Sequence, residues 1–218
     1  MPKRMKIGLL MTIGVSTLVL GLSGRWTDPW IWTYCATWAA TVSYGLLGID
    51  DDLARERFDP PSRGADTVAL AFVRLLGVAH LVVGALDAGR WHLTAPVPSA
   101  LRAAALAGMG LSAMLIYRAM HENHYFSAVV RVQEERGHRV IDTGPYSVVR
   151  HPGYVGMIAA MPLSGLALGS WVSFGIALAY SALILRRVMF EDAFLLRNLP
   201  GYAEYTRRVT RRLIPGMW

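Results

Sequence analysis

The sequence predicts an all-α fold, a polytopic bundle of transmembrane helices. Of its 218 residues, 54% are hydrophobic and only 17% are charged. In soluble domains about a quarter of all residues are charged. The apolar residues also gather into six long runs, and crossing the hydrocarbon core takes roughly 17–25 helical residues. We therefore expect about six spans, over residues 7–22, 30–48, 67–86, 101–117, 153–168 and 171–185.

The first run follows a basic start, as the apolar core of a cleaved signal peptide does. Trp26 and Asp28 stand where a small-residue cleavage site would be needed, so we expect a retained signal-anchor helix. The second run holds the single cysteine, Cys35, which excludes a disulfide within the chain and indicates a packing residue.

Three carboxylates, Asp50, Asp51 and Asp52, end the second run. Adjacent carboxylates can share a hard cation, but consecutive side chains on a helix point in different directions. We expect a solvated helix end and no metal site. Arg74 and His80 lie in the third run, where ionisable side chains usually face the protein interior. Arg74 is close enough to the end to reach the membrane surface, and a packed, hydrogen-bonded His80 is favoured over a functional one.

The last two runs are separated only by Gly169 and Ser170, which predicts a tight helical hairpin. Before the hairpin, the pattern predicts a helix over residues 121–137, which continues the fourth span along the membrane surface and ends at Gly137. After it, residues 200–215 read as an amphipathic helix that packs below the hairpin. Residues 1–120 thus form an N-terminal transmembrane part, and 121–218 hold most of the polar sequence that chemistry needs.

The net charge of +7 follows the predicted topology. Basic residues are dense at the N-terminus, in every second connection and after the sixth run, and sparse in the other connections. Six spans with cytoplasmic termini satisfy the positive-inside rule. The charge therefore indicates contact with membrane lipids and excludes nucleic acid as a partner. The basic positions are Lys3, Arg4, Lys6, Arg55, Arg57, Arg63, Arg118, Arg131, Arg136, Arg139, Arg150, Arg186, Arg187, Arg197, Arg207, Arg208, Arg211 and Arg212.

Candidate site residues surround the start of the fifth run. Pro152 suits the first turn of a helix, which places His151 at its N-cap and Tyr154 on the same side. Free backbone N–H groups at such an end attract anions. Gly153 and Gly156 remove side-chain bulk and allow a ligand or another helix to approach. The spacing alone leaves open a second interpretation, an interfacial helix start bound to lipid headgroups.

Two carboxylates, Glu191 and Asp192, follow the sixth run. The hairpin brings the polar ends of its two helices side by side, so both carboxylates should lie near His151 and Tyr154. A carboxylate there could bind an amino group or hydroxyls of a cofactor, or pair with Arg150. A plain salt bridge to Arg186 or Arg187 is the alternative.

Taken together, these motifs resemble the isoprenylcysteine carboxyl methyltransferase and phospholipid methyltransferase superfamily. The resemblance covers about the last 95 residues, and the Arg-His-Pro-x-Tyr-x-Gly string with its downstream acidic pair is its specific part. The motif segments are 137–141, 143–146, 150–156, 191–192 and the Gly201, Tyr205, Val209 spacing. The family often has two glutamates where this chain has Glu191 and Asp192, which puts the role of Asp192 in doubt.

The resemblance implies an S-adenosylmethionine-dependent methyltransferase whose cofactor site faces the cytosol. It implies that His151, Tyr154 and Glu191 contact the cofactor, and that Arg150 fixes the turn or steers an acidic substrate. Arg150, His151 and Glu191 would be the catalytic residues. The backbone that wraps the cofactor would be that of His138, Val140, Ile141, Gly144, Pro145 and Tyr146.

The acceptor is lipophilic in this interpretation, and a carboxylate of the isoprenylcysteine type is favoured. The motif is also compatible with a lipid amine, a fatty acid, an isoprenoid or a small thiol. A carboxylate is already ionised at neutral pH and needs no base, whereas an amine would need His151 or Glu191 to take its proton. Two other functions stay open: a sterol-reductase-like membrane enzyme using NADPH, and a transporter or lipid-binding scaffold. The small-residue spacing of Gly165 and Gly169 fits dimerisation or hairpin packing, so the oligomeric state is undetermined.

Overall fold

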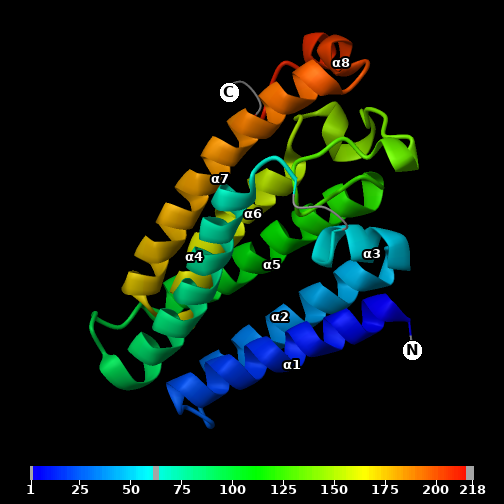
Figure 1. Cartoon of the computed structure of the whole chain (residues 1–218). Helices are drawn as coiled ribbons and strands as arrows, with labels where there is room; N and C mark the ends of the chain where they lie inside the picture. Colours follow the sequence, from blue (N-terminus) through cyan, green and yellow to red (C-terminus); the bar gives the residue numbers. More distant parts are fainter. Residues whose placement is uncertain (1, 61–63, 215–218) are drawn as a thin grey trace.

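The computed structural model of this chain describes residues 2–60 and 64–214. Within these ranges the fold is all-helical and contains no strand, as the composition predicted. Figure 1 shows a bundle of long helices with short polar segments gathered at one end. The long helices coincide with the six predicted runs or extend them. They are α1 (Lys3–Ser23), α2 (Pro29–Leu47), α4 (Thr67–Leu86), α5 (Ser99–Glu122), α6 (Pro152–Leu168) and α7 (Trp171–Asn198).

Four helical segments of the described chain are long and apolar enough to cross a membrane. These are α1, α5, α7, and α4 together with the π-helical turn η1 (Asp87–Trp91) that continues it. α2 has the length but a lower hydropathy, and α6 has only 17 residues. The chain is therefore an integral membrane protein, while the count of six spans and their orientation stay predictions.

The order of packing places α6 at the centre of the C-terminal half. α6 lies between α5 and α7, α4 packs against α7, and α1 packs against α2 (Figure 1). A buried apolar cluster joins α1, α2, α5 and α6 and includes Val19, Ile31, Met109 and Leu168. This cluster thus joins helices from both halves of the sequence.

The predicted hairpin of α6 and α7 is confirmed. Gly169 ends α6 with a φ of 92°, a left-handed conformation that favours glycine. Ser170 then caps α7, because its Oγ accepts a hydrogen bond of 3.1 Å from the N–H of Ser173. A Cβ atom at Gly165 would lie 2.6 Å from the backbone nitrogen of Phe174. The small residues therefore serve close packing inside the hairpin.

A short helix that was not predicted, α3 (Asp51–Phe58), follows α2. Asp50 is its N-cap, and its side chain accepts a hydrogen bond of 2.7 Å from the N–H of Leu53. Asp51 accepts from the first N–H groups of α1, at Lys3 and Arg4. The carboxylates thus mark the start of a helix and tie it to α1. No group of metal-ligating side chains occurs among the residues the structure describes.

The prediction of a helix over residues 121–137 is wrong. α5 ends at Glu122, and Asn123 adopts an extended conformation with φ −110° and ψ 100°. The Asn123 side chain accepts a hydrogen bond of 2.9 Å from the N–H of Tyr125, which closes a turn of the kind that competes with helix. Within residues 123–137, only the 3₁₀ turn η2 (Glu134–Arg136) is helical.

The rest of this connection is fixed by partners distant in the sequence. The N–H of Val130 donates to Asp66 Oδ1 at 3.1 Å, and its C=O accepts from the N–H of Ala65 at 2.9 Å. Arg131 forms two hydrogen bonds with Glu56 of α3, at 3.1 and 2.7 Å. These contacts satisfy groups that a helix would have paired locally, and they close the segment over the polar end of the bundle.

The predicted C-terminal helix is also too long. α8 (Tyr202–Arg208) ends before Val209, and the chain then turns back toward α6. There the carbonyls of Arg211 and Arg212 accept hydrogen bonds from the backbone N–H groups of Arg150 and His151, at 2.9 and 3.0 Å. These tertiary bonds replace helical ones. Pro215 of the predicted helix and Arg63 of the basic connection lie outside the described residues.

Candidate functional site

A cavity of about 680 Å³ opens among α2, α4, α5, α6 and α7. Its volume falls within the range of small-molecule sites, about 300–1,000 Å³. Polar side chains line one end, among them His138, His151 and Glu191. Apolar ones, including Met109 and Met161, line the part that lies within the bundle. One continuous space therefore joins the polar end to the apolar interior.

His151 stands at the head of α6 as predicted. It is the N-cap residue, Pro152 follows at the first helical position, and the His151 side chain is 6% exposed. Its ring lies 5.8 Å from that of Tyr154, measured between centroids. The N–H groups of Arg150 and His151 donate to the C-terminal tail, however. The sequence suggested that backbone N–H groups at this helix end would be free to bind an anion, but these two donors are not free.

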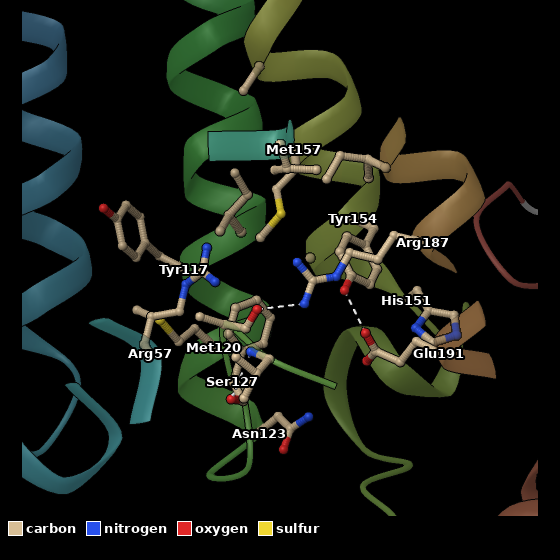
Figure 2. A pocket seen from close by; sticks show the side chains of 18 of the residues that line it. Arg57, Tyr117, Met120, Asn123, Ser127, His151, Tyr154, Met157, Arg187 and Glu191 are labelled. Atoms are coloured by element: carbon tan, nitrogen blue, oxygen red, sulfur yellow. Dashed lines mark hydrogen bonds between the residues drawn. The ribbon is translucent and has the colours of Figure 1, made fainter. Parts of the chain in front are cut away.

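Glu191 meets Tyr154 across the hairpin, as the sequence predicted. The Tyr154 hydroxyl donates a hydrogen bond of 2.5 Å to Glu191 Oε2, drawn as a dashed line in Figure 2. Glu191 lies on α7 itself, since this helix continues well beyond the predicted run. The alternative of a Glu191 salt bridge to Arg187 is not what the structure shows: the Arg187 Nε atom lies 3.0 Å from Asp66 Oδ2 instead.

Asp192 is the centre of a buried polar cluster, although the sequence left its role in doubt. Its two oxygens accept from Arg150 Nε and Nη2 at 2.8 and 2.9 Å. His151 Nε2 lies 3.1 Å from Oδ1, so this nitrogen carries the proton that Asp192 accepts. The Tyr202 hydroxyl and Arg212 Nε each donate at 2.8 Å. Asp192 therefore orients His151 and fastens α8 and the tail to α7.

The side chain of Arg150 forms its hydrogen bonds with other groups of the protein. Besides Asp192, its Nη1 donates to the carbonyl of Val209 at 2.8 Å, and the residue is 6% exposed. Of the two roles that the resemblance implied, fixing the turn agrees with these contacts. Arg150 also lines the cavity, although these guanidinium contacts are all to protein groups.

Only some of the residues expected to wrap the cofactor line the cavity. His138, Val140, Ile141 and Tyr146 line the cavity, whereas Gly144 and Pro145 do not. The last two begin the 3₁₀ turn η3 (Gly144–Ser147), where Gly144 has a φ of 54° and backs onto Glu122. Burial raises the pKa of the Tyr146 phenol, so this hydroxyl stays protonated.

His138 is held neutral at the cavity rim. Its ring stacks on Tyr125 at 4.4 Å between centroids, and its Nδ1 accepts a hydrogen bond of 3.2 Å from the N–H of Gln133. Burial lowers the pKa of His138 to about 4, and the positive charges of Arg131 and Arg136 add to this effect. A neutral ring that already stacks on one side is suited to packing against a planar or apolar group.

The glycines of the motif face protein groups. A Cβ atom at Gly156 would lie 2.6 Å from the carbonyl oxygen of Ser112 on α5, and one at Gly153 would lie 2.6 Å from the Phe126 ring. Of the two predicted reasons for these glycines, close approach of another helix applies to Gly156, whereas Gly153 lies against the side chain of a non-helical residue and also lines the cavity.

At the deep end of the cavity, His80 is 1% exposed and hydrogen-bonded. Its Nδ1 lies 2.8 Å from Ser173 Oγ and its Nε2 lies 3.3 Å from Ser164 Oγ. Ser164 in turn lies 2.7 Å from the Tyr34 hydroxyl. These contacts agree with the packed, hydrogen-bonded role that the sequence favoured. Arg74, by contrast, is exposed on α4.

Sequence reasoning missed Arg57 and Arg187 as site residues. It counted both among the charges that set the topology, yet both line the cavity. Figure 2 shows their guanidinium groups pointing into the pocket from opposite sides. Arg187 also donates to the carbonyl of Ala128 at 2.5 Å. Nothing in the local spacing distinguishes these two arginines from their exposed neighbours Arg55 and Arg186.

Known proteins match the part of the chain that builds most of this site. Residues 104–197 match the family model described as "Isoprenylcysteine carboxyl methyltransferase (ICMT) family". This range contains most of α5, the connection over residues 123–151, α6 and most of α7. It leaves out α3 with Arg57 and α8 with Tyr202.

Two curated relatives also match part of the chain. The cobalt-zinc-cadmium resistance protein CzcN of Cupriavidus metallidurans is 31% identical over 78 residues, 35% of this chain and 36% of the relative. The nickel-cobalt-cadmium resistance protein NccN of Alcaligenes xylosoxydans xylosoxydans is 33% identical over 70 residues, 32% of this chain and 33% of the relative. The matches thus span only about a third of each relative.

The family match falls on the residues that carried the resemblance, including the Arg150–Gly156 string and the Glu191–Asp192 pair. The description of that family is one of methyltransferases. Residues 104–197, less than half of the chain, are therefore similar to the isoprenylcysteine carboxyl methyltransferase family.

Proposed function

We propose that this chain is a membrane methyltransferase that uses S-adenosylmethionine and methylates a lipophilic acceptor, most simply a carboxylate of the isoprenylcysteine type. The observation that carries this proposal is the single cavity with a polar end at Glu191, Tyr154 and His151 and an apolar part inside the bundle. A water-soluble cofactor and a lipid-soluble acceptor can meet only in a space open to both environments.

The polar end fits the cofactor chemically. Glu191 can accept hydrogen bonds from an amino group or from ribose hydroxyls, and Tyr154 holds this carboxylate in place. Tyr154 and Tyr146 present aromatic rings at the same end, which suit a positively charged sulfonium. His138, Val140 and Ile141 offer a neutral, largely apolar wall for a planar base. S-adenosylmethionine supplies a methyl group on a positively charged sulfur, which an acceptor takes by in-line displacement.

The protein then has to align the acceptor and exclude water. The apolar wall of the cavity, with Met157 and Met161, suits a hydrocarbon chain that enters from the membrane. The segment 123–139 covers the polar end and is tied to α3 through Glu56 and Arg131. An acceptor carboxylate needs no base, since it is ionised at neutral pH. The basic connections and the positive-inside rule support a cytoplasmic position for this end.

The test is binding of S-adenosylmethionine to the detergent-solubilised full chain by calorimetry. Wild-type protein and the control Glu204→Gln, an exposed change on α8, should bind it. Glu191→Gln and His151→Ala should bind at least about tenfold more weakly, because each loses a contact that the cofactor needs. Transfer of a radiolabelled methyl group to N-acetyl-S-farnesylcysteine then tests the acceptor. NADPH binding by a folded protein that does not bind S-adenosylmethionine would overturn the proposal.

A further inference from the structure

Arg57 presents a cation to the cavity from outside the family segment. It lies on α3, and its side chain is half-buried and lines the cavity. Its guanidinium lies 5.4 Å from the centre of the Phe126 ring, in a cation–π contact. Among the residues the structure describes, Arg57 has no ion pair and no hydrogen bond.

The other arginines at the cavity wall that are not exposed each have a carboxylate partner. Arg131 pairs with Glu56, Arg150 with Asp192, and Arg187 with Asp66. Arg57 differs from all three, although it stands in the same low-dielectric space. Its guanidinium points toward that of Arg187 across the pocket (Figure 2).

This arrangement is unfavourable without an anion. Burial lowers the pKa of the Arg57 guanidinium, and the positive charge of Arg187 lowers it further. A desolvated charge is costly unless it is paired. Tyr117, Tyr154 and Tyr180 are the other groups that affect Arg57 electrostatically, and all three are neutral phenols below their pKa. A negative charge bound next to Arg57 would therefore stabilise its guanidinium group.

We propose that Arg57 is a specificity-determining residue that binds the anionic group of the lipophilic acceptor, so that the acceptor is a carboxylate and not an amine. This inference rests on the proposed function and gives it a residue from the N-terminal half. Glu191 is the single acidic side chain among the described residues that line the cavity. Its repulsion would keep an acceptor anion on the Arg57 side, while an ammonium acceptor would be repelled by Arg57.

The position also suits the reaction. Arg57 and Tyr154 line the same cavity (Figure 2), and Tyr154 contacts Glu191 at the end assigned to the cofactor. An anion held by Arg57 would thus lie beside the cofactor end. Its hydrocarbon chain would extend along the apolar wall near Met120 and Met157.

The experiment compares an acid with its neutral ester. Binding of N-acetyl-S-farnesylcysteine and of its methyl ester is measured by calorimetry in detergent, on wild type, Arg57→Gln, Arg57→Lys and Arg55→Gln. Arg55 is the matched control, since it lies on the same helix, carries the same charge, is exposed and does not line the cavity. Arg57→Gln keeps a polar side chain without the charge, and a thermal unfolding scan verifies that it folds.

Wild type and Arg55→Gln should bind the acid about 10- to 100-fold more tightly than the ester, as expected for hydrogen bonds to a charged group. Arg57→Gln should bind both equally, and Arg57→Lys should keep part of the preference, because it retains the charge but not the planar group. Acid preference that survives in Arg57→Gln, or equal binding of acid and ester by wild type, would overturn the inference.

Cofactor binding separates this inference from the proposed function. S-adenosylmethionine should bind to wild type and Arg57→Gln with the same affinity, within about twofold, because Arg57 serves the acceptor. An acid preference that depends on Arg57 in a protein that does not bind S-adenosylmethionine would support the anion site and refute the methyltransferase. Cofactor binding without any acid preference would support the methyltransferase and refute the anion site.

Discussion

Replacing Asp192 by asparagine tests whether this carboxylate holds the site together. The substitution keeps the volume of the side chain but removes the charge that four side chains share. Arg150, buried at 6% exposure, would lose its only carboxylate partner among the described residues. The new amide N–H₂ would face Arg and Tyr donors where an acceptor is needed.

The magnitude follows from the burial of this pair. Breaking a buried ion pair by removing one partner costs about 3–5 kcal/mol, because the remaining charge is left uncompensated. A chain of this length loses roughly 2–4 °C of Tm per kcal/mol. Asp192→Asn should therefore lower the Tm by about 6–20 °C, and cofactor affinity should fall with it, since His151 and the tail lose their common anchor.

The assay is thermal unfolding of the detergent-solubilised protein, followed by near-UV circular dichroism. Asp142→Asn is the matched control, because Asp142 pairs with Arg208 at the surface, where the two side chains are 35% and 64% exposed. An exposed pair contributes about 0–1 kcal/mol, so this variant should shift the Tm by less than about 4 °C. Equal Tm changes in the two variants would refute the structural role of Asp192.

Three further predictions concern the cavity and the helices around it. Because the folded-state pKa of His138, about 4, is below its unfolded value of about 6.5, its contribution to stability is complete above pH 6.5 and is lost as pH falls toward 4. In a pH series of Tm values, His138→Gln should reduce this loss, and an unchanged profile would contradict the assignment. Gly156→Ala should cost about 1–3 kcal/mol, because its Cβ would lie 2.6 Å from a backbone carbonyl of α5. In the same unfolding assay Gly175→Ala, whose Cβ would lie in open space, should be neutral or stabilise by up to about 1 kcal/mol. Tyr154→Phe removes the hydrogen bond to Glu191, so calorimetry should show about a 3- to 10-fold loss of cofactor affinity; an unchanged affinity would show that Glu191 needs no such support.

Most helices were predictable because membrane helices carry a strong local signal. Each of the six apolar runs became a helix, since a long apolar segment satisfies its backbone groups internally. The tight hairpin could be predicted for the same reason, because Gly169 and Ser170 leave no room for a longer loop. From that hairpin alone, the meeting of Tyr154 and Glu191 followed, although 37 residues separate them.

The two wrongly predicted helices rested only on the local spacing of polar and apolar residues. Residues 123–133 and the tail after Arg208 both have helix-like patterns, yet neither is an α-helix. Their backbone groups bond to residues far away in the chain, such as Asp66 for the first segment and Arg150 for the second. A window of neighbouring residues contains no information about such partners.

The sequence by itself determined the membrane class, the helical hairpin and the motif that marks the family, because each depends on residues close together in the chain. Only the tertiary structure decided which charges matter. Arg55 and Arg57 are equivalent in the sequence, yet one faces outward and the other points into the cavity. Likewise Asp192, which the motif left in doubt, anchors the site, since burial brings Arg150, Tyr202 and Arg212 around it. The energy of a charge depends on its surroundings, and folding alone creates those surroundings.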